Sequence, residues 1–443
     1  MRVLVVGGGL AGLTAAHVLS RDGHEVTVLE AAPEPGGKLR RTEVGGVVVD
    51  VGAEAMLNRR LEGVTLASEL GLEVVHPAVR SSRIWTRGAL RPLPRSVMGV
   101  PVDLGELRAT GLLSEAGLAR VEAEQPGLPA DEDISVADLV GSRLGDEVVD
   151  RLVEPLLGGV YAGQARRLSA RATVPQLVSL AAAGPLLGAQ LPASDRPVFA
   201  GLPGGMARLT ETLAAQVPVR TGVTVRELAR TEGGFAVVAG PTTTPERIEA
   251  DAVVLATPAA PTARLLGAVV PAAAAELAEI EYASVVVVTL AFRSDDVRGL
   301  DDSSGFLVPP VDGRAIKAST FSFAKWDWVR EAGAGHGLVH LRTSLGRHGE
   351  EATLQRTDEE LVAASLADLA EAAGIGAAPV ATHVQRWGGG LPQYAVGHLD
   401  RVTRIRAAVD GVPGLVLCGA AYDGVGIPAV IASARAAAAA VQV

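Results

Sequence analysis

The sequence predicts an α/β fold whose parallel sheet begins near one end of the chain and is completed near the other. Three observations predict it. Residues 3–6 form a short apolar run of mostly β-branched residues, followed at once by glycines and a helix-spaced segment. Residues 25–29 then have the pattern of a second strand, which completes a βαβ unit. Residues 415–418 are again strand-like and lead into a glycine turn and a small-residue helix.

The composition narrows the class of protein. With 443 residues the chain is long enough for about two or three domains. A net charge of −10 argues against nucleic acid as the main partner, because phosphate binding needs a basic surface. The single cysteine, Cys418, excludes an intramolecular disulfide and a cysteine-based metal cluster, so we expect a cytoplasmic protein without a metal site. Lysine occurs only at positions 38, 317 and 325, and we attribute this scarcity to the base composition of the genome.

We expect neither a signal peptide nor a transmembrane segment. The basic residue Arg2 leads directly into the first strand and its glycines, with no cleavable small-residue site after an apolar region. The longest apolar stretch is interrupted by Gly184, Pro185 and Gly188, so it makes a poor membrane helix. The sequence gives no signal for an oligomeric state.

The first motif is Gly7-x-Gly9-x-x-Gly12, between the first strand and the first helix. In such a motif the first glycine permits a tight turn, the second lets the backbone approach a pyrophosphate, and the third lets the helix pack closely on the strand. The helix N-terminus offers unpaired amides to the phosphates. The motif therefore predicts dinucleotide binding, with a turn that holds no ligand as the alternative.

Glu30 ends the second strand, about twenty residues after the glycine motif. A carboxylate in that position can accept hydrogen bonds from a ribose 2′-hydroxyl. It also repels a 2′-phosphate, so Glu30 disfavours NADP.

A second glycine loop follows the acid and favours a larger cofactor than NAD. Gly36 and Gly37 lie just past Glu30, and Lys38 or Arg40 could neutralise a phosphate there. A solvated surface loop is the alternative for these residues. The segment 50–54 then ends the next strand in another small-residue turn. Glycine turns at several strand ends line one edge of a sheet, which is where open α/β folds bind their ligands.

Five motifs together resemble a known family. They are GGGLAGL at the start, the E…GGK loop, DVGAE, LPQYAVGH at 391–398 and GAAYDGVGIP at 419–428. They are similar to the flavin-dependent protoporphyrinogen and coproporphyrinogen oxidases, which belong to the FAD-dependent amine oxidase superfamily. The last two motifs are the most specific, and the resemblance runs from residue 1 to about residue 435. It is weakest in the middle third of the chain.

The resemblance implies FAD as the cofactor and places its contacts on this sequence. They fall on Gly7, Gly8, Gly9, Leu10, Ala11, Gly12, Glu30, Gly36, Gly37, Lys38, Gly52, Ala53, Glu54, Ala55, Val225, Trp387, Val425, Gly426 and Ile427. Cys418 ends a buried-looking strand instead of standing in the Ser-Gly-Gly-Cys-like setting of covalent flavin attachment. We therefore expect noncovalent FAD and a structural thiol.

The resemblance also implies a substrate site. Arg83 stands where the family places an arginine facing a propionate, and Tyr394 falls near the flavin ring in related folds. A coproporphyrinogen carries four propionates, so we expect several arginines in the cavity that binds it. Arg59 and Arg60 are further candidates, as are Arg166, Arg167 and Arg171, although a solvated surface arginine is the alternative for each.

The implied activity is the oxidation of coproporphyrinogen III to coproporphyrin III in haem biosynthesis. It removes six electrons and reduces three O2 to H2O2, and the protein mainly binds and orients its reactants. We name no side chain as an obligate acid or base, and we expect His398 to be structural. Protoporphyrinogen IX oxidase is the alternative, followed by another flavin amine oxidase or desaturase, or by a nucleotide-binding protein without turnover.

The expected fold has three parts: a discontinuous Rossmann-like FAD-binding domain, a strand-rich substrate-binding domain and a helical domain. The FAD-binding domain should comprise 1–75, 200–280 and 385–443. The substrate-binding domain should comprise 76–95 and 281–384, and the helical domain 96–199.

Overall fold

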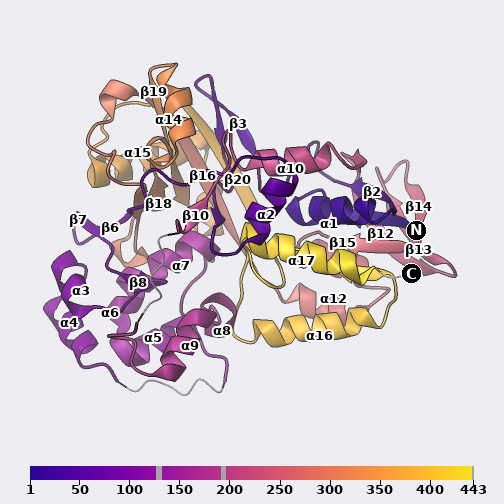
Figure 1. The fold of residues 1–443 in the computed structure, drawn as a ribbon, viewed down its shortest axis with the longest axis horizontal. Helices are drawn as coiled ribbons and strands as arrows, with labels where there is room; N and C mark the ends of the chain where they lie inside the picture. The colour runs from indigo at the N-terminus through magenta and orange to yellow at the C-terminus, as the bar shows by residue number, and fades with distance from the viewer. Residues whose placement is uncertain (126–131, 191–195, 442–443) are drawn as a thin grey trace.

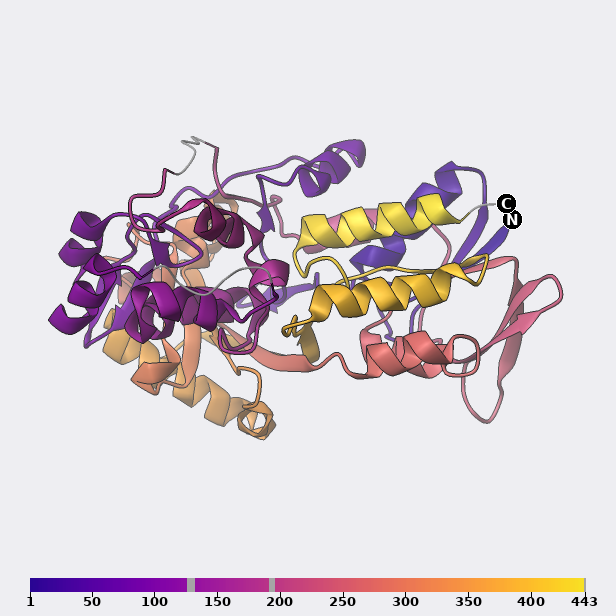
Figure 2. The same ribbon diagram turned by 90° about the horizontal axis from the view of Figure 1, so that it is seen from below.

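The computed structural model describes residues 1–125, 132–190 and 196–441, and it confirms the predicted α/β class. A five-stranded parallel sheet has the order β11-β2-β1-β15-β21. Its strands are β1 (Arg2–Val6), β2 (Glu25–Leu29), β11 (Val219–Arg220), β15 (Ala252–Leu255) and β21 (Leu415–Leu417). The sheet therefore combines strands from the beginning, the middle and the end of the sequence. Both ends of the chain lie together at one end of the molecule (Figures 1 and 2).

Alternate residues of β1 enter two different cores, as the period of a strand dictates. Val3 and Val5 face the core shared with α1 (Leu10–Arg21), α10 (Ala207–Ala214) and α17 (Ile427–Ala440). Leu4 and Val6 face the core shared with α11 (Ala259–Leu266), α12 (Pro271–Ala278) and α16 (His398–Asp410). Apolar side chains thus cover both faces of the sheet, which is why its strands are almost continuously hydrophobic.

An antiparallel meander lies beside the second core. Its strands are β12 (Val225–Thr231), β13 (Gly234–Ala239) and β14 (Glu246–Ala250). Phe235 and Val237 of β13 are buried against the five-stranded sheet. The meander forms the tip of the molecule in Figure 2.

A second sheet of seven strands has the order β20-β16-β19-β18-β17-β6-β7. They are β6 (Arg83–Thr86), β7 (Ala89–Pro92), β16 (Tyr282–Arg293), β17 (Gly305–Leu307), β18 (Ile316–Thr320), β19 (Leu338–Leu345) and β20 (Ala381–Pro392). The expected domain boundary at residue 385 therefore falls inside β20. Helix α15 (Asp358–Ala373) packs on this sheet and begins with a capping box formed by Thr357 and Glu360.

Smaller elements connect the two sheets. The hairpin β3 (Arg41–Val44) and β4 (Val47–Asp50) leads to β5 (Met56–Leu57), which pairs with β10 (Phe199–Ala200). Helix α2 (Glu62–Glu69) follows β5, and the helices α13 (Ser322–Lys325) and α14 (Asp327–Ala334) stand between β18 and β19. Arg435 of α17 pairs with Glu69 of α2 at 2.6 Å, which ties the last helix to this connecting region.

The described part of 96–199 is mainly helical. It includes the short hairpin β8 (Ser96–Val97) and β9 (Val100–Pro101) and the helices α3 (Leu104–Thr110), α4 (Glu115–Glu122), α5 (Val136–Leu144), α6 (Asp146–Val148), α7 (Glu154–Tyr161), α8 (Ala170–Thr173) and α9 (Pro175–Ala183). A π-helical segment, Val149–Val153, joins α6 to α7. Among the residues that the structure describes, every helix is too short or too polar to pass through a lipid bilayer.

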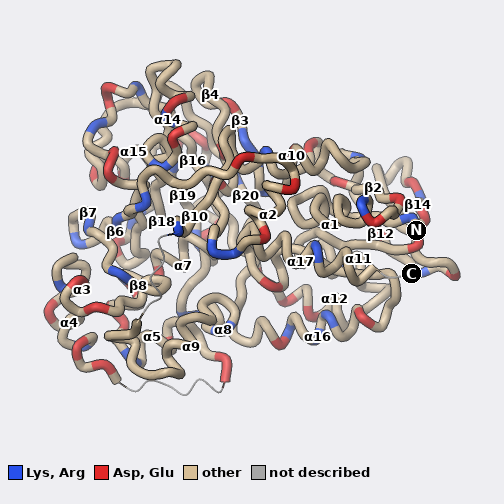
Figure 3. Tube along the Cα trace, viewed as in Figure 1, with Lys and Arg blue, Asp and Glu red and all other residues tan. Residues whose placement is uncertain are grey.

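Acidic and basic residues are interspersed along the chain (Figure 3). Many of them form surface ion pairs, such as Arg404 with Glu276 at 2.6 Å. Each exposed pair adds little stability, so this pattern mainly sets which arginines are already engaged by a carboxylate.

Candidate cofactor and active site

The turn between β1 and α1 has no room for side chains at Gly7 and Gly12. The Gly7 amide donates to Leu29 O at 2.8 Å, and Gly7 has a φ of 107°. A Cβ at Gly7 would lie 2.9 Å from Ala256 O, and one at Gly12 would overlap the carbonyl oxygen of Gly7. The glycines at 7 and 12 thus allow the turn, the helix and β15 to pack backbone to backbone.

Glu30 supports this turn directly. One carboxylate oxygen accepts from the Gly8 amide at 2.6 Å and the other from the Ala32 amide at 2.7 Å. A carboxylate has about four acceptor positions, so a ribose hydroxyl could still donate to it. The main chain of Glu30 is held by Arg220 O and by the Val223 amide, at 2.9 and 2.8 Å. Val225, the predicted contact, lies two residues further on at the start of β12.

The second glycine loop lies against the first. The Gly36 amide donates to Gly8 O at 2.8 Å, and Gly9 and Gly36 form a parallel bridge. A Cβ at Gly37 would lie 3.1 Å from the Gly9 Cα, and Gly37 has a φ of 59°. Two turns that are separate in the sequence thus form one continuous backbone surface.

The third turn lies against the second. The Ala53 amide donates to Lys38 O at 3.2 Å, and a Cβ at Gly52 would overlap that oxygen. Trp387 of β20 covers the turn from the side, since its indole Nε1 donates to Val51 O at 3.2 Å. Trp387 is therefore placed beside Gly52, and Ala55 follows in the same loop.

Lys38 directly follows the second glycine loop, and its side chain is exposed to solvent. Desolvation by the surrounding protein nevertheless lowers its pKa to about 8. That position suits a cation facing a bound phosphate.

The fourth turn follows β21. The Cys418 amide donates to Leu255 O at 3.1 Å, and the Gly419 amide donates to Ser433 Oγ at 3.2 Å. A Cβ at Gly419 would lie 3.9 Å from the Cβ of Ala11, so this turn borders the start of α1. The Cys418 thiol is fully buried, and desolvation raises its pKa to about 12, which makes it a structural thiol.

Two helices begin at the same sheet edge. Helix α1 starts after Gly9 and α17 starts after Gly426, with Val425 and Ile427 on either side of that glycine. Their first amides have no partner within their own helix, so both helices offer donors to an anion at the carboxyl ends of the strands. The four turns, Lys38 and the two helix N-termini fit a flavin dinucleotide, whose diphosphate and sugars need close backbone approach.

Tyr394 lies in the protein interior. The side chain is 1% exposed and its hydroxyl donates to Ala420 O at 2.6 Å. Its ring stacks on His398, with centroids 3.9 Å apart, and His398 Nε2 contacts Tyr422 O at 3.1 Å. Tyr394 and His398 thus contact the backbone that follows the fourth turn, and a substrate contact by Tyr394 stays a prediction.

Glu54 also differs from the expectation. Its carboxylate accepts from Lys325 Nζ at 2.7 Å and from Ser322 Oγ at 3.1 Å, and lies 3.2 Å from Arg342 Nη2. Burial alone would raise the pKa of Glu54, but Arg342 and Lys325 outweigh it and lower the pKa to about 2. The side chain is therefore committed to this buried charge cluster, and only the backbone of Glu54 remains for a cofactor.

Asp50 begins the same turn and is also buried. It accepts from the amides of Met206 and Ala207 at the start of α10, at 2.8 and 3.4 Å. Desolvation raises its pKa to about 7 in spite of these bonds.

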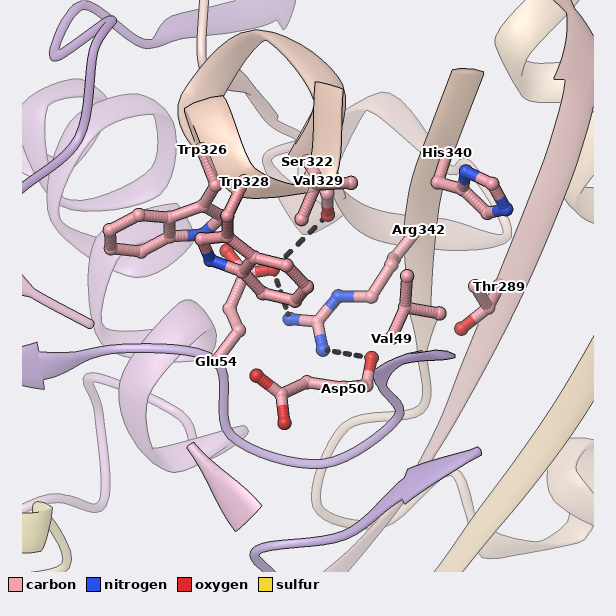
Figure 4. Close-up of a pocket in the computed structure, with 10 residues that line it drawn as sticks. All are labelled: Val49, Asp50, Glu54, Thr289, Ser322, Trp326, Trp328, Val329, His340 and Arg342. Atoms are coloured by element: carbon pink, nitrogen blue, oxygen red, sulfur yellow. Dashed lines mark hydrogen bonds and ion pairs between the residues drawn. The ribbon is translucent and has the colours of Figure 1, made fainter. Parts of the chain in front are cut away.

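A small cavity lies beside this cluster (Figure 4). It has room for about one water molecule, so it is too small for a flavin or a tetrapyrrole. Four polar atoms of its lining have no hydrogen-bond partner within the described ranges, an arrangement that suits a single bound water: Thr289 Oγ1, Trp326 Nε1, His340 Nδ1 and Arg342 Nε.

The predicted substrate arginines are not gathered into one cluster. Arg83 of β6 pairs with Asp302 at 2.5 Å, and Arg60 pairs with Glu62 at 2.7 Å. Arg59 lies exposed in the loop after β5. The remaining three are placed in the helical part: Arg166 pairs with Asp150 and Arg167 with Glu281, each at 2.7 Å, and Arg171 lies on α8.

Arg342, Lys325 and Ser322 were not predicted. They come from the strand-rich part of the chain and meet the turn through contacts about 270 to 290 residues apart in sequence. One signal was present: two of the three lysines, Lys38 and Lys325, lie at this site. In a chain that uses arginine almost everywhere, the positions that keep lysine were candidates for a specific role.

Comparisons with known proteins agree with this geometry. The family of flavin containing amine oxidoreductases matches residues 10–442. The coproporphyrinogen III oxidase of Mycobacterium tuberculosis (strain ATCC 25618 / H37Rv) is 37% identical over 97% of this chain and 95% of its own length. That of Bacillus subtilis (strain 168) is 30% identical over 98% and 96%. The crystal structure of a "putative protoporphyrinogen oxidase" from Exiguobacterium sp. 255-15 superposes with a TM-score of 0.86 and 31% identity, covering 99% of this chain and 98% of that one.

Proposed function

This chain belongs to the flavin containing amine oxidoreductase family and groups there with the coproporphyrinogen III oxidases, and from that premise we propose that it oxidises coproporphyrinogen III to coproporphyrin III. It is an oxidoreductase whose cofactor is FAD. The observation that carries the proposal is 37% identity along nearly the whole of both chains. The four glycine turns and the N-termini of α1 and α17 form a backbone surface at the sheet edge, which we call the cradle. This surface supports the proposal independently.

The residues of the cradle would hold FAD as follows. The amides at the start of α1 and the Gly36–Lys38 loop would bind the diphosphate, and Glu30 would accept from a ribose hydroxyl. The N-terminus of α17, at Gly426, would face the anionic part of the flavin ring, with Trp387 beside it. Because Cys418 is buried, we propose that FAD is held without a covalent bond.

Bound FAD supplies a two-electron acceptor that dioxygen regenerates with release of H2O2. The substrate loses six hydrogens in all, so about three such rounds with three O2 balance the reaction. The protein's part is to bind the macrocycle, orient a reduced meso carbon and exclude water. We assign no side chain as acid or base.

The propionates of the substrate would bind to arginines whose ion-pair partners are exposed carboxylates. Arg83 is 37% exposed and its partner Asp302 68%, so their ion pair is worth little and a propionate could replace the aspartate. Arg59, which is exposed in the loop after β5, is the other candidate for propionate binding. We also propose that the three-part domain division holds, with its last boundary moved to the end of β20, and that the enzyme acts in the cytoplasm.

The proposal is tested with purified protein. We expect it to be yellow, to release free FAD on heating, and to oxidise coproporphyrinogen III faster than protoporphyrinogen IX when porphyrin fluorescence is followed. Equal or reversed rates would reject coproporphyrinogen as the preferred substrate. Flavin bleaching by amines or by phytoene under anaerobic conditions, without porphyrinogen turnover, would point to another member of the family.

A further inference from the structure

The strand-rich part of the chain holds the loop 50–54 at several points, and one guanidinium contacts three of its residues. Arg342 lies on β19, where its Cα is in register with Thr289 of β16. Its Nη1 donates to Gly52 O at 2.7 Å and to Asp50 O at 3.2 Å, and its Nη2 lies 3.2 Å from Glu54. Figure 4 shows the guanidinium between the Glu54 carboxylate and the Asp50 backbone.

The other side of the same loop touches the cradle. The Ala53 amide bonds to Lys38 O, and Gly52 has no room for a Cβ between that oxygen and Trp387. Any shift of the carbonyls that Arg342 holds would therefore move the contact between the third turn and the Gly36–Lys38 loop. The loop is a direct mechanical link between the second sheet and the cradle.

The cluster is dry. The side chains of Arg342 and Glu54 are 14% and 8% exposed, and the neighbouring cavity has room for about one water molecule. One water molecule cannot supply all the hydrogen bonds of the guanidinium. Its removal would leave the carbonyls of Asp50 and Gly52 without this donor, and Glu54 with only Lys325 and Ser322.

We propose that Arg342 is a positioning residue for the flavin: without touching it, Arg342 fixes the Gly52–Ala53 turn against the Lys38 loop and thereby sets the affinity and the environment of the bound cofactor. The inference rests on the proposed function only as far as FAD binding. The planar fork of arginine reaches three acceptors at once, which the single ammonium of a lysine does not.

The experiment compares Arg342→Met, Arg342→Lys and the control Arg298→Met, which removes an exposed arginine paired with Asp295. FAD dissociation constants, the visible flavin spectrum and the melting temperature of the apoprotein are measured for each. We expect Arg342→Met to weaken FAD binding at least about tenfold and to shift the flavin spectrum, because it removes hydrogen bonds of a charged donor. Arg342→Lys should fall between it and the unchanged protein, and Arg298→Met should match the unchanged protein.

A merely structural role gives a different pattern. It would lower the melting temperature of the apoprotein in Arg342→Met while the soluble fraction binds FAD with unchanged affinity and spectrum, and that result overturns the proposal. If Arg342→Met does not fold, Arg342→Lys decides by the same two measurements. Arg342-dependent flavin binding in a protein that leaves coproporphyrinogen III unoxidised would defeat the proposed function and leave this inference standing.

Discussion

The amide of Gly36 donates a hydrogen bond to the carbonyl oxygen of Gly8 at 2.8 Å, joining two loops that are separate in sequence. Gly36 has a φ of 115°, and a Cβ there would lie 2.9 Å from Leu39 O. We predict that Gly36→Ala costs about 1–3 kcal/mol of folding stability and abolishes tight FAD binding, because the loop must move away from Gly8.

Flavin retention after gel filtration, with unfolding midpoints, checks this prediction. Gly233→Ala is the control, since a Cβ there meets nothing within 4 Å and the residue does not have a left-handed φ. A Gly36→Ala protein that keeps its full complement of flavin would contradict it.

Glu54 should give the apoprotein part of its resistance to acid. Its pKa is about 2 in the folded chain against an ordinary value of 4.5, so it stabilises the fold above pH 4.5 and that contribution disappears as the pH falls toward 2. We expect Glu54→Gln to lack this slope and to be less stable at neutral pH, on the order of 3 kcal/mol. Denaturant midpoints between pH 2 and 7 measure both effects, and Glu211→Gln, which removes a surface pair with Arg41, should keep the slope.

Asp50 should give the stability of the apoprotein the opposite dependence on pH. Its folded pKa of about 7 lies above the ordinary 3.8, so its contribution to stability is complete below pH 3.8 and is lost as the pH rises to about 7. Asp50→Asn is expected to flatten the stability of the apoprotein across that window. The same slope in both proteins would show that Asp50 ionises normally.

Arg83 offers a test of the propionate site. Because its pair with Asp302 is exposed, Asp302→Asn should free the guanidinium and lower KM for coproporphyrinogen III about two- to fivefold. Arg83→Ala should raise KM more than it lowers kcat, since it removes binding that is the same in the ground and transition states. Steady-state kinetics on both variants decide the point, and a loss confined to kcat would assign Arg83 another role.

Tyr394→Phe probes the support of the fourth turn. The variant keeps the ring that stacks on His398 but loses the bond to Ala420 O. We expect about 1 kcal/mol less stability and an unchanged KM for the porphyrinogen. A large rise in KM would return Tyr394 to the substrate site.

The parts of the site that could be predicted are those that depend on local backbone chemistry. About thirty residues were enough to predict the βαβ unit and its turn. They contain the apolar run at 3–6, the spacing of Gly7, Gly9 and Gly12, and the acid at position 30, and each of these patterns predicts a local structure. The return of the chain at β21 was also predictable, because a buried strand and a glycine turn recur there.

The parts that could not be predicted depend on distant pairing. Nothing in the sequence around Arg342 shows that its partners are the carbonyls of residues 50 and 52, and nothing around Glu54 shows that its side chain joins this buried cluster. The burial of the Tyr394 side chain was likewise not evident from its motif. The predicted boundary at residue 385 falls within β20, which pairs with β16 of the second sheet up to Pro392.

The order in which the chain is made has a consequence for how the cofactor is acquired. During translation, β1, α1 and β2 leave the ribosome first, but the edge strand β21, which pairs with β15, and helix α17 follow nearly four hundred residues later. A nascent chain up to β20 therefore has an unpaired edge at β15 and an α1 that has not yet met α17. We therefore expect flavin to bind late in synthesis, and we expect a chain that ends before residue 415 to be degraded without binding FAD.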